Sequence, residues 1–195
     1  MIDGVVNILK PEGMTSHDVV NKVRKIFHTK KVGHTGTLDP NAVGVLPICI
    51  GQGTRLAEYL TDKEKVYKTI LNFGRETDTQ DISGQPTKET ALPSLSREEF
   101  SQILTSFVGE IEQIPPMYSA IKKDGQPLYQ LARKGISVEI APRKVVIKDI
   151  QLLMYTPQSA MLEIRCGKGT YIRTLCQDIG RACQSSAYMS YLLRT

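Results

Sequence analysis

Long apolar runs are missing from this 195-residue sequence, and none reaches the roughly 20 residues needed to cross a bilayer as a helix. The first residues have neither the basic leader nor the apolar core of a secretory signal peptide. The sequence also lacks internal repeats and low-complexity segments. With 41% apolar and 23% charged residues, it is typical of a globular protein, for which the cytoplasm is the default location.

Cysteine is scarce as well, with only Cys49, Cys166, Cys176 and Cys183. No two of them form a CxxC pair and no histidine lies near any of them in sequence, so a zinc site has little support. Cys176 and Cys183 are seven residues apart, a spacing that places both on one face of a helix. Since no secretory signal is seen, we expect buried structural thiols rather than disulfides.

Basic residues outnumber acidic ones, giving a net charge of +5 and a pI of about 9.0. This surplus permits a polyanionic partner but does not require one. The charge is densest in residues 22–31, KVRKIFHTKK, which hold five Lys or Arg and no acid. Charge alone does not distinguish a nucleic-acid contact from a solvated helix end at this place.

Apolar periodicity and turn residues predict strands at residues 4–9, 43–50, 65–73, 144–155 and 161–166, with Pro47 as a candidate interruption. Helices are predicted after Thr15 and Ser96, each followed three residues later by an acid, and also at 54–60 and within GKGTYIRTLCQDIGRAC (167–183), after its glycine-hinged turn. Residues 28–42 and 74–86 are predicted loops, 114–135 an excursion from the core, and 187–195 a strand or helix end. The pattern indicates an α+β fold with a mixed, mostly antiparallel sheet flanked by helices.

The loop GHTGTLDP at residues 33–40 is the strongest candidate for chemistry. Asp39 precedes a proline, which pushes its backbone towards an extended conformation, and the glycines allow the loop to approach a ligand closely. A carboxylate on such a loop, near many lysines, is placed to meet a phosphate-rich substrate. The local pattern alone favours the simpler interpretation that Asp39 braces a turn.

Two other stretches are candidates for ligand contacts. In GKGTYIR at 167–173, Lys168 and Arg173 lie beside exposed backbone N–H groups at a helix start, which favour anions. Tyr67 on the strand KVYKTIL could offer its ring to a base, although strand tyrosines more often pack in the core.

Six sequence blocks together, in order and at matching spacings, resemble the TruB family of pseudouridine synthases. The blocks are KPEGMTSHD (10–18), GHTGTLDPNAVGVLPICIG (33–51), KVYKTILNFGRETDTQDISG (65–84), IPPMYSAIKKDGQPLYQLARKG (114–135), CGKGTYIRTLCQDIG (166–180) and AYMSYLLRT (187–195). Six blocks in order make a chance match implausible. They favour a catalytic role for Asp39 over the simpler interpretation that it braces a turn. The resemblance implies an enzyme that isomerises a uridine in the T loop of tRNA.

The resemblance also implies the roles of individual residues. Asp39 matches the nucleophilic aspartate, Tyr67 the aromatic residue that stacks on the target base, and Arg173 the arginine that pairs with the aspartate. The supporting residues that it implies are His34, which contacts the target loop as the base is flipped out, Leu192, which lines the uracil pocket, and Lys10 and Pro11, which support the active-site loop.

The chemistry is consistent with this set. The reaction breaks a C–N glycosidic bond and forms a C–C bond from the same ribose carbon, and a carboxylate can act there as nucleophile. A guanidinium such as that of Arg173 favours the ionised carboxylate and holds it in one geometry. Nothing is oxidised or hydrolysed overall, so we expect no metal and no cofactor. The partner that the resemblance implies is tRNA, and we expect the basic residues of 22–31 and 114–135 to contact its backbone.

Full-length members of the family continue into a small C-terminal RNA-binding module. We therefore expect residues 1–195 to be one catalytic domain without that module, monomeric and not bound to a membrane. Two alternatives stay open. A non-catalytic tRNA-binding or RNA-folding protein would need the basic surface but not both Asp39 and Arg173. A metal-dependent nuclease would use Asp39, Asp78 and Asp81.

Overall fold

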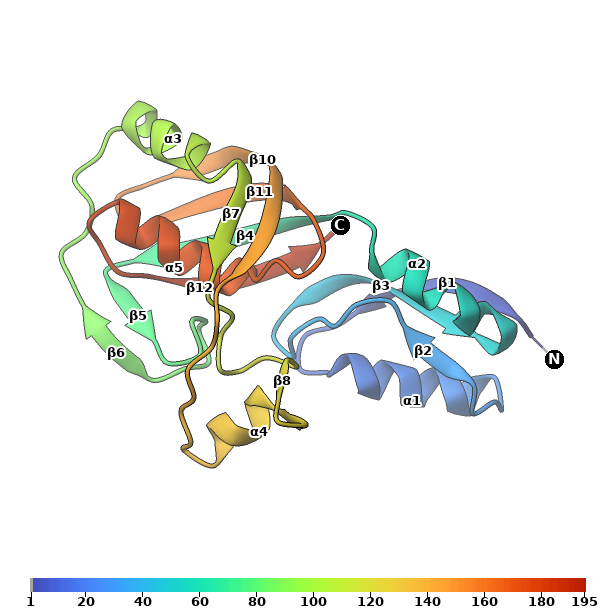
Figure 1. Ribbon diagram of the computed structural model, residues 1–195. Helices are drawn as coiled ribbons and strands as arrows, with labels where there is room; N and C mark the ends of the chain where they lie inside the picture. Colours follow the sequence, from blue (N-terminus) through green and yellow to red (C-terminus); the bar gives the residue numbers. More distant parts are fainter. Residues whose placement is uncertain (1) are drawn as a thin grey trace. The chain divides into compact units, whose positions relative to one another are not determined.

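The computed structural model describes residues 2–195, which form two compact units (Figure 1). The first unit contains the residues up to Lys68 together with Tyr191–Thr195, and the second contains Thr69–Ser190. Two strands, β4 (Lys65–Phe73) and β12 (Ala187–Arg194), contribute residues to both units. In residues 2–195 no helix combines the length and apolar character needed to span a membrane.

The first unit is a small sheet covered by a helix. Strand β1 (Gly4–Lys10) runs antiparallel to β3 (Val43–Ile50), from the pair Gly4 and Ile50 to the pair Lys10 and Gly44. The other edge of β3 pairs with β2 (Val32–His34) and, in parallel, with the end of β12. Helix α1 (Ser16–Ile26) packs its valines against the buried side chains of β3, so this apolar face forms the core of the unit.

The start of α1 is capped as the sequence predicts. The Thr15 hydroxyl accepts the Asp18 N–H at 3.1 Å, and the Asp18 carboxylate accepts the Thr15 N–H at 2.9 Å. This capping box satisfies two of the N–H groups that a helix start leaves without a helical partner. The helix predicted at 54–60 is instead a 3₁₀ turn (Gly51–Leu56) followed by the short α2 (Ala57–Thr61).

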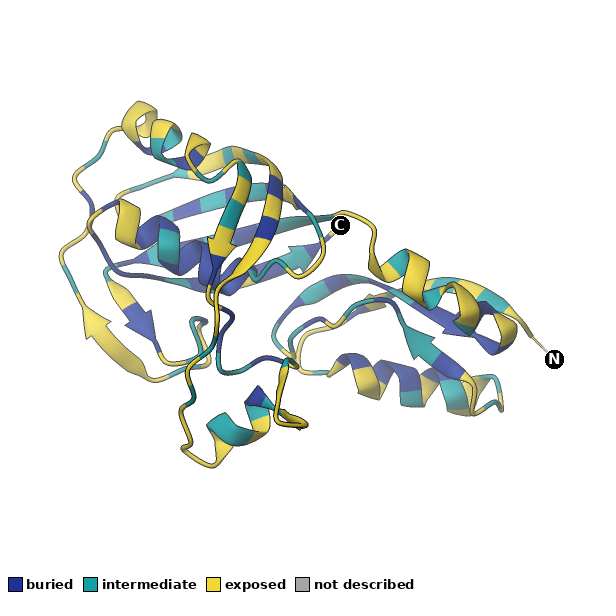
Figure 2. Ribbon diagram, viewed as in Figure 1, coloured by how far each residue is buried: buried dark blue, intermediate teal, exposed yellow. Residues whose placement is uncertain are grey.

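The second unit is a larger sheet with strand order β12-β4-β11-β10-β7. Strand β10 (Arg143–Tyr155) runs antiparallel to both β11 (Ser159–Cys166) and β7 (Gly109–Gln113). Helix α5 (Ile172–Ala182) is buried along most of its length, whereas the hairpin of β5 (Arg75–Thr77) and β6 (Pro86–Glu89) has an exposed outer strand (Figure 2). The predicted mixed, mostly antiparallel fold with flanking helices is confirmed.

Helix α3 (Arg97–Thr105) is attached to this sheet through aromatic rings. Phe100, fully buried, stacks on Tyr155 with 4.7 Å between ring centroids and meets Phe73 edge-on at 5.8 Å. Residues 114–135, the predicted excursion, hold the two-residue strands β8 (Lys122–Lys123) and β9 (Gln126–Pro127) and the short helix α4 (Leu128–Arg133).

Several sequence-based boundaries were wrong. The predicted loop at 28–42 contains β2, and the predicted loop at 74–86 contains β5 and the start of β6. Strand β7 was not predicted at all. Pro47 does not interrupt β3, because proline removes only the N–H donor, and its carbonyl still accepts the Thr35 N–H at 3.2 Å.

Candidate functional site

The backbone on both sides of Asp39 is anchored within the first unit. On the N-terminal side, the Ser16 hydroxyl accepts the Leu38 N–H at 2.9 Å and donates to the Leu38 carbonyl at 3.2 Å. On the C-terminal side, the Pro40 carbonyl accepts the Gly13 N–H at 2.9 Å. The half-buried Asp39 is therefore presented on a loop that is fixed to the start of α1 and to the turn before it.

The side chain of Lys10 supports the same loop. Its side chain is fully buried, and Nζ donates to the carbonyls of Pro11 at 2.8 Å, Met14 at 2.7 Å and Pro40 at 3.2 Å. Burial lowers the pKa of Lys10, while the carboxylates of Asp39 and Glu12 act in the opposite direction. The three carbonyl groups and the nearby Asp39 carboxylate thus offset the cost of burying the Lys10 ammonium group. A positive charge therefore lies close to the Asp39 loop.

His34 lies at the end of β2, half-buried, and its Nδ1 accepts the Gly36 N–H at 3.3 Å. Burial, and then the charges of Arg194 and His17, lower the pKa of His34. At neutral pH the imidazole is therefore uncharged, and because Nδ1 accepts, the hydrogen is on Nε2. His34 consequently presents a neutral Nε2–H group next to the loop that leads to Asp39.

Arg194, which was not among the predicted site residues, also contacts the backbone at Gly36. Its buried guanidinium donates through Nε to the Val45 carbonyl at 2.8 Å and through Nη2 to the Gly36 carbonyl at 3.3 Å. The backbone of Arg194 leaves no room for a side chain at Gly44, where a Cβ would lie 2.1 Å from the Arg194 oxygen. The block AYMSYLLRT contains Arg194, but no local pattern indicates that it folds back on residues 36–45.

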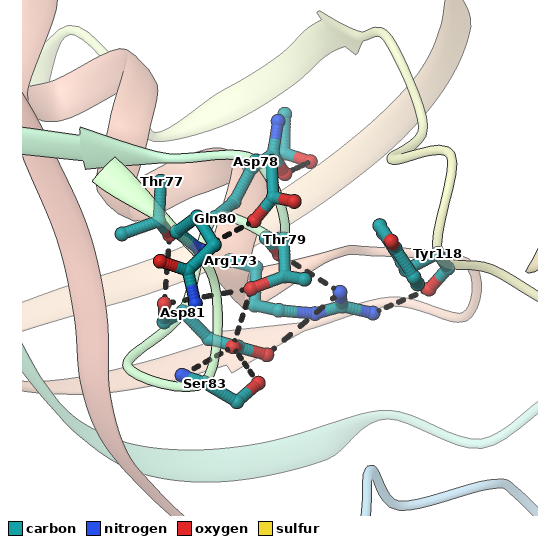
Figure 3. A network of polar contacts seen from close by, with 10 residues as sticks. Thr77, Asp78, Thr79, Gln80, Asp81, Ser83, Tyr118 and Arg173 are labelled. Carbon is teal, nitrogen blue, oxygen red and sulfur yellow. Dashed lines mark hydrogen bonds and ion pairs between the residues drawn. The ribbon is translucent and has the colours of Figure 1, made fainter. Parts of the chain in front are cut away.

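Arg173 is held inside the second unit, near the start of α5. Its side chain donates through Nη1 to the Thr79 carbonyl at 3.0 Å and through Nη2 to the Tyr118 carbonyl at 2.8 Å (Figure 3). The Asp81 carboxylate lies 3.9 Å from Nη1, and both side chains are almost fully buried. Arg173 is thus fixed by residues of two loops before any substrate binds.

Asp81 is in turn fixed by its own loop. Its Oδ1 accepts the Thr79 hydroxyl at 2.7 Å, the Ser83 N–H at 2.9 Å and the Ser83 hydroxyl (Figure 3). Asp81 was predicted only as a ligand in the nuclease alternative, so its position beside Arg173 was missed. The stretch TDTQDISG within the third block was the available signal.

The predicted site residues as a whole divide between the two units. Tyr67, half-buried on β4, Leu192, buried on β12, and Pro11, exposed before α1, belong to the first unit with Lys10, His34 and Asp39. Arg173 belongs to the second unit. The predicted pairing of Arg173 with Asp39 joins residues of different units and stays a prediction.

Comparisons with known proteins identify the family of this chain. The family described as TruB family pseudouridylate synthase (N terminal domain) matches residues 24–172, well over half of the chain. The chain belongs to this TruB family. It is 52% identical to the tRNA pseudouridine synthase B of Alkaliphilus oremlandii over 194 residues, covering 100% of this chain and 64% of that protein. The tRNA pseudouridine synthase B of Symbiobacterium thermophilum is also 52% identical, with 100% and 66% coverage. The chain therefore spans about two thirds of the length of these relatives.

Solved structures share the fold of this chain. The chain in a structure of a Cbf5–Nop10–Gar1 complex matches with a TM-score of 0.75 at 31% identity, covering 98% of this chain and 48% of that one. A chain in a structure of an H/ACA RNP bound to a substrate RNA containing 2'-deoxyuridine matches with a TM-score of 0.71 at 28% identity, covering 98% and 46%. TruB-family membership thus rests on the sequence matches, and the fold is shared with these two solved structures.

The nuclease alternative was based on Asp39, Asp78 and Asp81, and the structure shows how two of these carboxylates, those of Asp78 and Asp81, are bound. Among residues 2–195, no three or more His, Cys, Asp or Glu side chains are grouped as metal ligands would be. The Asp78 Oδ1 accepts the Gln85 N–H at 2.8 Å and the Asp81 Oδ1 accepts from Ser83, so both carboxylates stabilise their own loop.

Proposed function

We propose that this chain isomerises uridine to pseudouridine in the T loop of tRNA, with Asp39 as the nucleophile. The observation that carries the proposal is the Asp39 loop. It is anchored by Ser16 on one side and by Gly13 and Lys10 on the other, in a chain whose relatives are named tRNA pseudouridine synthase B. A nucleophile held in one geometry lowers the entropic part of the activation barrier.

The reaction needs no external reactant. The bond from the ribose C1' to the uracil N1 breaks, the uracil turns over, and C1' bonds to C5. The C5 hydrogen leaves as a proton and N1 gains one, so the atoms balance. The ionised Asp39 carboxylate attacks or stabilises C1' while the bond is broken, and the buried ammonium of Lys10 favours that charge.

The other predicted residues take complementary roles in this proposal. Tyr67 stacks on the target uracil and Leu192 lines its pocket, so that the detached base is retained. Arg173 orients the carboxylate of Asp39 through its planar fork, and Asp81 supports Arg173. His34 contacts the RNA loop as the base leaves its stack, and Pro11, next to Lys10, supports the loop from the turn before α1.

The T arm of tRNA is the proposed partner, bound by a monomer whose two units together form one catalytic domain. Lys22, Lys25, Lys30 and Lys31 are exposed, as are Lys122, Lys123, Arg133 and Lys134 of the excursion, so all can reach phosphates. Arg24 instead donates to the Val32 carbonyl at 3.3 Å and stabilises its own unit. Unstacking the target base costs a few kcal/mol, which these contacts and the pocket offset.

A tritium-release assay tests the proposal, because isomerisation frees the hydrogen on C5 and binding alone does not. The substrate is tRNA carrying 5-tritiated uridine, incubated with the chain with and without EDTA. We expect release in both samples, none with Asp39→Asn, and a normal rate with Asp149→Asn, which changes an exposed carboxylate of the second unit. Binding without release would instead support the non-catalytic RNA-binding alternative, and loss of activity with EDTA would contradict a metal-independent reaction.

A further inference from the structure

Gln80 has a backbone conformation that its side chain disfavours. Its φ is +63°, in the left-handed region that glycine adopts readily and glutamine rarely. It lies at the centre of the loop that holds Arg173, between Thr79 and Asp81. Such a conformation persists only where surrounding contacts fix it, and it is more frequent at functional sites.

The side chain of Gln80 supplies those contacts. Its Oε1 accepts the Thr174 hydroxyl at 2.9 Å, and its Nε2 donates to the Gln177 Oε1 at 2.8 Å. Gln177 in turn donates to the buried Glu76 carboxylate at 2.9 Å, which also binds Arg181. Thr174, Gln177 and Arg181 all belong to α5, the helix that carries Arg173, so Gln80 ties its loop to this helix.

The two neighbours of Gln80 both interact with Arg173. The Thr79 carbonyl accepts from the Arg173 guanidinium at 3.0 Å, and the Asp81 carboxylate lies 3.9 Å from it (Figure 3). The left-handed turn at Gln80 therefore allows residues on either side of it to meet one guanidinium. Backbone bonds complete the arrangement, since Gln80 N–H donates to Thr77 at 3.0 Å and its carbonyl accepts from Met189 at 3.1 Å.

We propose that Gln80 is a positioning residue for the isomerisation: by fastening the loop of Thr79 and Asp81 to α5, it fixes the guanidinium of Arg173 in its working geometry. The inference rests on the proposed function, because it assigns Arg173 a part in the reaction. Gln80 itself does not touch the substrate. Its removal therefore slows the chemical step and leaves tRNA binding intact, because the basic residues that reach phosphates are elsewhere.

A matched pair of glycine variants tests this. Gln80→Gly relieves the left-handed backbone and removes both bonds to α5. Gln184→Gly relieves the same kind of strain, since φ of Gln184 is +55°, but its side chain is exposed and, within residues 2–195, takes part in no hydrogen bond. An open pocket of about 630 Å³ borders Gln80, Thr174 and Gln177, so water can replace the lost amide and Gln80→Gly should fold.

The readouts are the single-turnover rate of tritium release at saturating tRNA, the Kd for tRNA and the melting temperature. We expect Gln184→Gly to match the wild type in rate and Kd. Gln80→Gly should lose about ten- to hundredfold in rate, with Kd within about twofold and a melting temperature close to that of the wild type, because relief of the left-handed backbone offsets the lost hydrogen bonds. Gln80→Glu, which keeps the acceptor for Thr174 but loses the donor to Gln177, should recover part of the rate.

A double-mutant cycle with Thr174→Val tests whether the effect passes through α5. The two substitutions remove one shared hydrogen bond, so their effects on the rate should be clearly less than additive. If Gln80→Gly melts far below the wild type, Gln80→Asn replaces it, because asparagine tolerates the left-handed backbone but is too short to reach α5. If folded Gln80→Gly or Gln80→Asn kept the wild-type rate, the positioning role would be overturned. Absence of tritium release from the wild type would instead refute the proposed function itself.

Discussion

Replacing Ser16 with alanine should destabilise the first unit and slow the reaction together. The Ser16 hydroxyl is buried and makes two bonds to Leu38, the residue before Asp39. A typical hydrogen bond contributes about 1 kcal/mol, and a buried N–H left unpaired costs about 1–3 kcal/mol. Because alanine leaves the Leu38 N–H without its acceptor, we expect the free energy of unfolding to fall by about 2–3 kcal/mol.

The same change releases the N-terminal side of the Asp39 loop. Since a displacement of about 1 Å at a reacting group can cost about a hundredfold in rate, we expect tritium release by Ser16→Ala to fall about tenfold or more in the folded protein. Urea unfolding followed by circular dichroism gives the stability, and the slope with urea should not change. The control is Ser94→Ala, an exposed serine of the second unit, which should stay within about 0.5 kcal/mol of the wild type. Wild-type stability and rate for Ser16→Ala would refute the anchoring role.

Three further predictions follow from the site. Asp39→Asn should abolish tritium release and leave the Kd for tRNA within about threefold, and measurable turnover by the pure variant would contradict its role as nucleophile. Arg173→Lys keeps the charge but loses the fork that binds Thr79 and Tyr118, so the single-turnover rate should fall about a hundredfold; near-normal turnover would disprove the need for that geometry. The pKa of His34 is lowered in the folded chain, so the unfolded chain takes up the proton first as pH falls. This stability contribution is complete above the ordinary histidine pKa of about 6.5 and is lost below it, and His34→Asn should flatten that dependence in urea titrations from about pH 7.5 to about pH 5.

The elements that could be predicted from the sequence are those determined by neighbouring residues. Thr15 with Asp18 and Ser96 with Glu99 specify helix starts through contacts three residues apart, and the structure has both capping boxes. Strand β7 was missed because its sequence, GEIEQ, is short and mostly polar, and its pairing partner β10 begins 30 residues after β7 ends. Its strand character comes from that distant partner rather than from its own residues.

The candidate site likewise has a part that could be predicted from the sequence and a part that could not. The local pattern around Asp39 favoured a turn brace, and only the order of six blocks indicated a nucleophile. The residues that the sequence did not reveal, Ser16, Asp81 and Arg194, act through hydrogen bonds to backbone or side-chain groups that depend on how the chain folds back. The double hydrogen bond of Ser16 spans 22 residues, and the contact of Arg194 with Gly36 spans 158. No pattern within a window of the usual length predicts such a contact.

The contact between Arg194 and Gly36 also determines when the site can form during synthesis. The first unit contains Tyr191–Thr195 as well as the residues up to Lys68, and all of Thr69–Ser190 is made in between. At about 5–20 residues per second, a ribosome spends roughly 6–24 s on that intervening segment. Until β12 emerges, the Gly36 and Val45 carbonyls have no guanidinium to bind, and β3 lacks its parallel neighbour. A nascent chain that has completed only residues up to Lys68 therefore already contains Asp39 but has not yet closed the loop around it.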